Sequence, residues 1–145
     1  MLKKSTLTVT AKDCPDQWFL VDAKDQVLGR LVSKLTSLLL GKNSPTYSPH
    51  LSSRNFVVII NCQDVKVTGK KEKEKAYYYY SGYPSGLRKE ILQDLRIKKP
   101  DEIIKHALRG MLPKNRLGKE IISHVYIYPD NKYPHEAQKP VKLEI

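Results

Sequence analysis

The feature that most constrains the fold is an unbroken apolar run in the middle of the chain, Phe56–Ile60. Its valines and isoleucines are β-branched, and such side chains favour extended backbone because they pack well on a pleated surface. The run does not alternate with polar residues, so it predicts a strand that is covered on both faces. A similar run at Trp18–Val21 ends at Asp22 and predicts a first buried strand.

Helical periodicity follows the first of these strands. Leucines recur at helical spacing over Leu28–Leu40, and Gly41 is a natural C-terminal stop, which predicts an amphipathic helix. A later helix is predicted to begin at Pro100 and to be broken at Gly110 and Pro113.

Shorter elements complete the pattern. We expect a short strand over Val65–Thr68, a helix from Lys89 past Leu95, a short helix over Leu117–Ser123 and a strand over Val125–Tyr128. Strands and helices interleave without an internal repeat or an obvious linker, which predicts an α/β domain with helices packed on a central sheet. Residues 1–145 are expected to form one domain with a short polar N-terminal segment and a Pro-rich C-terminal tail.

The charge is strongly positive. The chain has 26 Lys and Arg against 15 Asp and Glu, a net charge of +11 and a sequence pI near 9.6. A compact protein with this imbalance attracts polyanions, so nucleic acid is the first candidate partner and an anionic membrane the second. A basic surface that is simply solvated remains the plain alternative.

Several protein classes are disfavoured. Cys14 and Cys62 have no close Cys or His companion, so neither a disulfide framework nor a zinc site is indicated. The segment Met1–Ala11 lacks the apolar core of a signal peptide, and no segment approaches the ~20 apolar residues that span a bilayer. The pattern is typical of a protein of the cytoplasm or of an organelle interior.

Catalytic motifs are also missing. Gly41-Lys42 is similar to the end of a phosphate-binding loop, but Thr36 and Asn43 stand where that motif requires Gly and Ser or Thr. The histidines are scattered, and no nucleophile-elbow pattern occurs. We therefore expect no enzyme, no cofactor, no metal and no small-molecule substrate. We also expect no membrane partner, because the apolar stripe of Leu28–Leu40 is better explained as core than as a membrane-binding face. An RNA-modifying enzyme or nuclease is the competing class, and it would need a pocket with converging titratable groups.

Cations concentrate in or beside predicted loops, where long side chains reach phosphates without disturbing a core. Lys73 and Lys75 alternate with Glu72 and Glu74, so a solvated face is the better interpretation for that pair. The run Tyr77–Tyr80 has two readings of equal weight. In a strand, Tyr77 and Tyr79 face one way, and Tyr78 and Tyr80 face the other. One of these pairs is expected to pack, and the other pair, near Tyr83, either packs as well or stacks on RNA.

The segment Gly110–Lys119 has a clearer mechanism. Two glycines and a proline fix a tight loop, Met111 and Leu112 can anchor it, and cations surround Asn115. Such a loop can approach a folded RNA backbone and present positive charge in a preset geometry.

A set of short motifs runs through nearly the whole chain in a familiar order. They are Trp18–Ala23, Leu28–Leu31, Gly41-Lys42, Tyr47 with Pro49-His50, Ile60-Asn61, Thr68-Gly69, Ser81–Pro84, Gly110–Asn115, Leu117-Gly118 and Pro134-His135 with Gln138 and Pro140. In this order and spacing the chain resembles the bacterial type of the large-subunit ribosomal protein thirteen family. The Gly-Met-Leu-Pro and Ser-Gly-Tyr-Pro segments are the most specific.

The resemblance implies a three-layer α/β/α domain with a mixed, about four-stranded central sheet. It also implies a structural protein that binds large-subunit ribosomal RNA and neighbouring ribosomal proteins, joins early in assembly and has no catalytic activity. The location implied is the large subunit of a cytoplasmic ribosome, with an organellar ribosome left open. The residues expected to contact RNA, from their loop positions and from the resemblance, are Arg30, Lys42, His50, Arg54, Lys70, Lys71, Tyr79, Tyr80, Tyr83, Arg88, Lys114, Asn115, Arg116, Lys119 and His135.

The chain departs from the family pattern at three places. Ser52, Arg54 and Asn55 replace an acidic turn before the central strand, Tyr79-Tyr80 replaces an Arg-His pair, and Lys70 stands where Asn is usual. We expect local contacts to differ there while the fold is retained.

Overall fold

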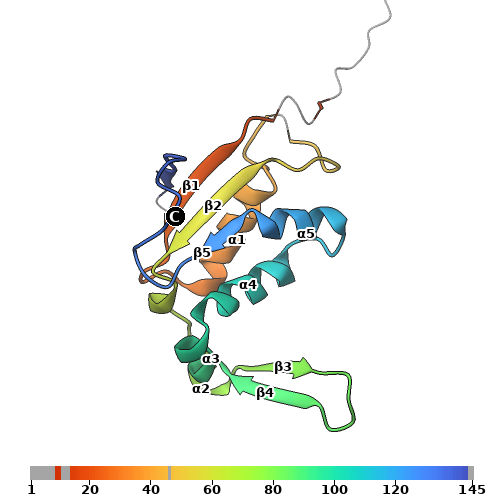
Figure 1. The fold of residues 1–145 in the computed structure, drawn as a ribbon, viewed down its shortest axis with the longest axis vertical. Coiled ribbons are helices and arrows are strands. Elements are labelled where there is room, and N and C mark those ends of the chain that lie inside the picture. The colour runs from red at the N-terminus through yellow and green to blue at the C-terminus, as the bar shows by residue number, and fades with distance from the viewer. Residues whose placement is uncertain (1–8, 11–13, 46, 144–145) are drawn as a thin grey trace, which may run out of the picture.

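A four-stranded parallel sheet forms the centre of the computed structural model, which describes residues 9–10, 14–45 and 47–143 (Figure 1). The strands are β1 (Gln17–Asp22), β2 (Asn55–Ile60), β5 (Val125–Ile127) and β6 (Val141–Leu143), in the order β5-β2-β1-β6. Leu20 of β1 lies beside Val58 of β2 in the register. The predicted N-terminal segment lies largely outside the described residues.

One face of the sheet packs against helices. Helix α1 (Leu28–Leu39) connects β1 to β2 and lies beside α4 (Pro100–Met111), while α5 (Arg116–Ser123) leads into β5. The core between them is built from fully buried aliphatic side chains, among them Leu31, Leu35, Val57, Ile59, Ile104, Leu108 and Ile121. The helical spacing of the leucines in α1 is therefore explained by burial, as predicted.

The opposite face carries a smaller, aromatic cluster. Leu20, Val58 and Ile60 are buried there beneath Trp18 and the tyrosines Tyr126, Tyr128 and Tyr133. The indole of Trp18 stacks on Phe56 at 4.7 Å and on Tyr126 at 5.7 Å between ring centroids. Trp18 of β1 and tyrosine rings from the chain's C-terminal segment thus cover this face, where the resemblance implied a second helical layer.

A β-hairpin projects from the lower end of this body (Figure 1). After a short 3-10 turn (Cys62–Asp64) and helix α2 (Lys71–Glu74), strands β3 (Ala76–Tyr80) and β4 (Leu87–Ile91) pair in antiparallel fashion, and α3 (Leu92–Lys98) follows. The hairpin forms a sheet of its own.

The α/β prediction with a four-stranded central sheet is confirmed, and the structure corrects several details. Antiparallel pairing occurs in the hairpin, while the four central strands are all parallel. Val65–Thr68 forms only a single bridge, between Lys66 and Val27. The helix predicted from Lys89 begins at Leu92, because the preceding residues pair with β3. The Pro-rich tail contributes β6, whose pairing with β1 is too long-range for local sequence to indicate.

Candidate nucleic-acid interface

A polar cleft of about 600 Å³ lies between the hairpin and helix α4, and we call it the hairpin cleft. Strands β3 and β4 supply one wall, and α4 with the end of α3 supplies the other. The residues that line it are Tyr77, Tyr78, Tyr79, Arg88, Glu90, Leu95, Lys99, Glu102, Lys105, His106 and Arg109. Most are polar or aromatic, so the cleft suits a polar ligand.

Contacts at the base of the hairpin cleft fix its shape. The Tyr77 ring meets His106 edge-on at 4.9 Å between centroids, and the Lys75 ammonium lies 5.1 Å from the Tyr77 ring centroid. Burial raises the pKa of the Tyr77 hydroxyl. An alternate pair was predicted to pack, but only Tyr77 of the run does so, and Tyr78, Tyr79 and Tyr80 are each more than 60% exposed.

The cations of the hairpin cleft fall into two groups. Lys99 lies 3.4 Å from Glu102, and Lys105 lies 2.9 Å from Asp101, so these ammonium groups are partly neutralised. Arg88 and Arg109 form no ion pair with any carboxylate in the part of the chain that the structure describes. Their guanidinium groups are thus available for phosphate, which they match in bidentate geometry.

A second cleft, of about 450 Å³, lies at the junction of α4 and α5, and we call it the loop cleft. It is lined by Arg109, Pro113, Lys114, Asn115, Gly118, Lys119 and Ile122. Three of these residues are cations, and Arg109 also lines the hairpin cleft. One arginine therefore joins the two clefts into one positively charged surface along α4.

The loop between α4 and α5 is held by its own backbone contacts. The Asn115 side-chain oxygen accepts a hydrogen bond from the Gly118 amide at 2.8 Å and so caps α5. A Cβ at Gly118 would overlap the Pro113 carbonyl oxygen, so this close approach requires glycine. Leu112 is buried and anchors the loop, whereas Met111, also predicted as an anchor, is 46% exposed.

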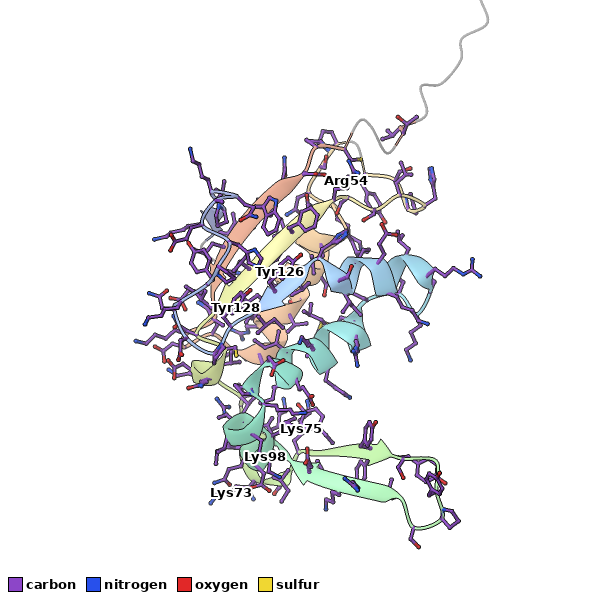
Figure 2. The ribbon with its side chains drawn as sticks, in the orientation of Figure 1. Arg54, Lys73, Lys75, Lys98, Tyr126 and Tyr128 are labelled. Atoms are coloured by element: carbon purple, nitrogen blue, oxygen red, sulfur yellow. The ribbon has the colours of Figure 1, made fainter. Side chains whose placement is uncertain are left out.

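The predicted contact residues around the turn before β2 lie elsewhere, in the loop that follows α1. His50 Nδ1 is 3.1 Å from the Ser48 hydroxyl, and Arg54 lies 3.5 Å from Asp16. Figure 2 shows Arg54 at the end of the body away from the hairpin. Lys42 is exposed in the same loop. Arg54 has a left-handed backbone conformation with φ 51°. The turn that departs from the family pattern thus carries an ion-paired cation.

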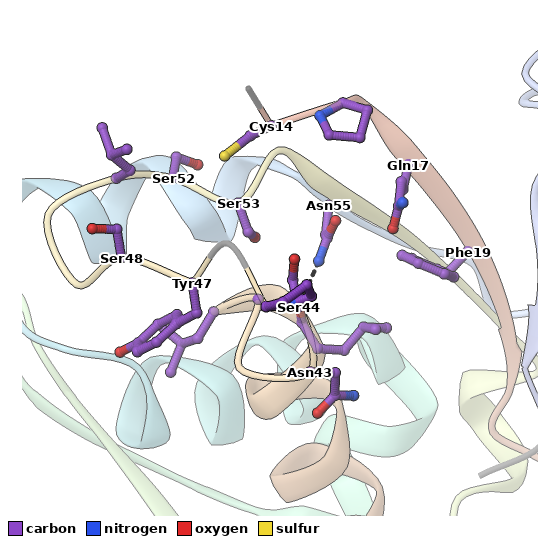
Figure 3. A pocket seen from close by; sticks show the side chains of 16 residues that line it. Cys14, Gln17, Phe19, Asn43, Ser44, Tyr47, Ser48, Ser52, Ser53 and Asn55 are labelled. Atoms are coloured by element: carbon purple, nitrogen blue, oxygen red, sulfur yellow. Dashed lines mark hydrogen bonds between the residues drawn. The ribbon is translucent and has the colours of Figure 1, made fainter. Parts of the chain in front are cut away.

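A third cavity, of about 410 Å³, lies under this loop and is lined by apolar and neutral polar side chains (Figure 3). The Asn55 amide donates a hydrogen bond to the Leu38 carbonyl at 2.7 Å, and the Ser53 hydroxyl donates to the Leu39 carbonyl at 2.5 Å. These bonds tie the loop to the end of α1. The described residues that line the cavity include no Lys, Arg, His, Asp or Glu, so it offers no cationic side chain to a phosphate.

The remaining predicted residues are dispersed. Arg30 is exposed on α1, and Lys70 and Lys71 are exposed at the start of α2. His135 is half-buried, its Nε2 lies 3.0 Å from the Tyr128 hydroxyl, and its ring centroid lies 4.4 Å from that of Tyr126. Packing on the aromatic face of the sheet therefore accounts for His135. Two of the predicted residues, Tyr79 and Arg88, line the hairpin cleft. The loop cleft is lined by three others, Lys114, Asn115 and Lys119, and Arg116 is exposed beside it.

Sequence reasoning missed the α4 contribution. Lys105, His106 and Arg109 lie on the polar side of that helix, opposite Ile104 and Leu108. Their three- and four-residue spacing places them on one face of the helix. The amphipathic pattern of α4 could therefore have predicted a cationic face there. Long cationic side chains are expected mainly in loops, so these helical cations were not predicted to contact RNA.

Two other kinds of site are absent from the described residues. No group of His, Cys, Asp and Glu among the described residues could hold a metal ion. No described helix is both long and apolar enough to cross a membrane.

The α/β body and its cation-lined clefts fit the class of ribosomal proteins, and comparison with known proteins supports that class. The family described as Ribosomal protein L13 matches residues 16–134. The large ribosomal subunit protein uL13 of Nitratidesulfovibrio vulgaris is 44% identical over 140 residues, which is 97% of each chain. The protein of the same name from Caldanaerobacter subterraneus is 47% identical over 133 residues, or 92% of this chain and 93% of that one.

The chain therefore belongs to the ribosomal protein L13 family. This confirms the resemblance carried by the short motifs. The family is one of structural proteins and not of enzymes, so the expectation of a non-catalytic protein is confirmed as well.

Proposed function

We propose that this protein is a structural constituent of the large ribosomal subunit of a cytoplasmic ribosome, that it binds large-subunit ribosomal RNA, and that it joins the subunit early in assembly beside neighbouring ribosomal proteins. Its fellow family members are named as proteins of that subunit. We further propose that residues 1–145 act as one domain. The observation that carries RNA binding is the position of Arg109, which lines both cation-bearing clefts.

The clefts suit the RNA backbone for an electrostatic reason. Phosphates repeat along each strand, so a surface with several separated cations neutralises several phosphates at once and releases their counterions. Arg88, Arg109, Lys114 and Lys119 provide such a series across the hairpin cleft and the loop cleft. Because Arg88 and Arg109 have no carboxylate partner among the described residues, they need not break an ion pair before binding.

Not every predicted contact belongs to this surface. We propose Arg88, Lys114, Arg116, Lys119, Tyr79 and Asn115 as its members, with Arg109 added from the structure. Contacts through Arg30, Lys42, His50, Arg54, Lys70, Lys71, Tyr80, Tyr83 and His135 remain predictions from the sequence.

The test is a titration of large-subunit ribosomal RNA with the purified protein at several salt concentrations. The logarithm of the binding constant should fall steeply with the logarithm of salt concentration, by about 0.9 for each neutralised phosphate in the duplex DNA reference case. The double variant Arg88→Gln with Arg109→Gln should lower the slope by about two units, since each lost contact removes about one.

A matched control removes exposed charge elsewhere. Lys34 on α1 and Lys132 are exposed and line neither cleft, so Lys34→Gln with Lys132→Gln removes the same charge and should leave the slope almost unchanged. Equal losses in both double variants would show that net charge alone drives binding. A wild-type slope near zero would overturn the proposed RNA-binding function.

The ribosomal role has a separate test in cells. The protein should co-sediment with large subunits in a sucrose gradient after a high-salt wash, because integral subunit proteins remain bound when loosely associated factors dissociate. Depletion should yield incomplete large-subunit particles if the protein joins early. A protein found only in the free soluble fractions would contradict the proposal.

A further inference from the structure

The hairpin has two chemically different faces. In its antiparallel register Tyr79 lies opposite Arg88, while Tyr80 lies opposite Leu87. Directly opposed residues share a face, and faces alternate along each strand. Tyr79 and Arg88 face the hairpin cleft, so Tyr80 and Leu87 belong to the other side, which we call the outer face.

Four side chains of the outer face are notably exposed. Tyr78 is 66%, Tyr80 61% and Leu87 62% exposed, and Lys89 lies opposite Tyr78. Tyr78 also forms part of the wall of the hairpin cleft, but alternation assigns its ring to the outer face. At the tip of the hairpin, Tyr83 is 75% exposed. The outer face therefore presents a row of tyrosine rings beside a cation.

The hairpin is tied to the body at its base. The Leu92 amide donates a hydrogen bond to the Lys75 carbonyl at 2.9 Å, where the hairpin meets α3. Arg96 of α3 binds both Glu72 oxygens at 2.9 Å and also donates to the Gln63 and Val65 carbonyls. Figure 2 shows the two strands extending beyond this base, with Lys75 and Lys98 near the attachment. An isolated two-stranded hairpin is marginally stable in water, so its exposed rings gain from a bound partner.

Charge selects the partner. The strand residues assigned to the outer face are Ala76, Tyr78, Tyr80, Leu87, Lys89 and Ile91, which include a cation and no carboxylate. The one acidic side chain of the two strands, Glu90, belongs to the cleft side, where Lys98 lies 3.6 Å from it. An anionic partner with flat, stackable groups fits this composition, and unpaired nucleotides have both properties.

We propose that the outer face of the hairpin binds unpaired RNA nucleotides, whose bases stack on Tyr78 and Tyr80 while Lys89 contacts a phosphate. This inference rests on the proposed RNA-binding function and extends it. The two faces bind different parts of the RNA. The cleft side binds the phosphate backbone through Arg88 and Arg109, and the outer face binds bases. A duplex hides its base surfaces within the stack, so the outer face selects bulged or looped RNA.

The experiment compares two RNA probes with the full chain. One is a stem-loop with 2-aminopurine at unpaired loop positions, and the other is a fully paired duplex of the same length. The double variant Tyr78→Thr with Tyr80→Thr keeps residues that favour strands but removes both rings. It should bind the stem-loop about tenfold or more weakly, bind the duplex almost as wild type does, and lose the fluorescence change that stacking produces.

Two control variants separate stacking from other effects. Tyr78→Phe with Tyr80→Phe keeps the rings and should restore stem-loop binding and the fluorescence change. Tyr47→Thr removes another exposed tyrosine, from the loop after α1, and should change neither. Circular dichroism and thermal melting of each variant show whether the fold is retained.

The possible results are distinguishable. Salt-dependent RNA binding that is unchanged in the threonine double variant would overturn the stacking proposal and leave the proposed function standing. Equal losses for the stem-loop and the duplex would overturn it too, because stacking on unpaired bases predicts a difference. If the wild-type protein binds neither probe nor ribosomal RNA in a salt-dependent way, the proposed function itself fails. If the threonine variant binds RNA normally but loses a neighbouring ribosomal protein, the outer face is a protein-docking surface and the nucleotide proposal is wrong.

Discussion

Strands β2 and β3 each contain an unbroken run of apolar or aromatic side chains, yet the two runs differ in their exposure to solvent. In β2, Val57, Val58 and Ile59 are fully buried because helices cover one face of the sheet and aromatic rings cover the other. In β3, Tyr78, Tyr79 and Tyr80 are each more than 60% exposed because the hairpin forms a two-stranded sheet of its own that projects from the body. A run of apolar or aromatic residues thus predicts a strand, while its burial depends on what packs against it.

The comparison also separates stability from recognition. The body buries aliphatic side chains, and such burial is the main favourable contribution to folding. The hairpin and the loop cleft expose rings and cations, which add little to folding and are available to a ligand. Substitutions in the body should therefore lower stability first, and substitutions in the clefts should lower RNA binding first.

The largest expected effect is a charge placed in the body. Leu35 is fully buried on α1, so Leu35→Asp buries an unpaired carboxylate and should lower the free energy of unfolding by at least about 4 kcal/mol. The matched change Ile97→Asp, at a residue that is 80% exposed on α3, should alter it by less than about 0.5 kcal/mol. Denaturant unfolding of both variants measures the difference. Equal losses in the free energy of unfolding would show that Leu35 is no more buried than Ile97.

A smaller effect is expected at the glycine that closes the loop cleft. Gly118→Ala places a Cβ against the Pro113 carbonyl, which is backbone and cannot move freely, so we expect a loss of about 1–3 kcal/mol and weaker RNA binding. Gly110 lies within α4 with open space around it, and Gly110→Ala should stabilise by up to about 1 kcal/mol. Thermal melting and RNA titration test the pair. Similar melting temperatures for the two variants would refute the close approach.

The loop cations should affect binding and not folding. Lys114 and Arg116 are exposed, so Lys114→Ala with Arg116→Ala opens no cavity and should barely change the melting temperature. The salt slope for RNA binding should fall by about two units if each side chain neutralises one phosphate. Titrations at several salt concentrations measure this. Unchanged affinity and slope would mean that the loop serves packing or protein contacts.

The smallest expected effect is a pH dependence in the body. Burial lowers the pKa of His124, against weaker opposing contributions from Glu120 and Asp16, and its ring packs on Phe56 at 4.6 Å between centroids. The unfolded chain therefore binds a proton more readily than the folded one. This contribution to stability is complete above the ordinary pKa of 6.5 and is lost as the pH falls through the lower folded value.

Unfolding measured across that pH range tests this reasoning. The wild type should lose stability on acidification in part through His124, and His124→Gln should flatten that part of the curve. A variant with the same pH dependence as the wild type would assign the acid sensitivity to other groups.

Much of this protein follows from local sequence. The buried strand Phe56–Ile60, the helix from Leu28 and the helix from Pro100 could be predicted because their side-chain periodicity reports which faces are covered. The loop after Gly110 could be predicted as a rigid cationic turn because glycine and proline restrict backbone geometry locally. The short motifs also indicated the family, which the comparisons confirm.

Other features were decided only by the tertiary structure, because they depend on residues far apart in the chain. Strand β6 exists because Val141–Leu143 pairs with β1, and His135 packs because Tyr126 and Tyr128 lie on the same face. The shared cleft residue Arg109 meets the hairpin on one side and the α5 loop on the other. Local periodicity reports which side of an element is covered, but not which distant element covers it, and that choice places the cations of α4 and of the α5 loop beside the hairpin.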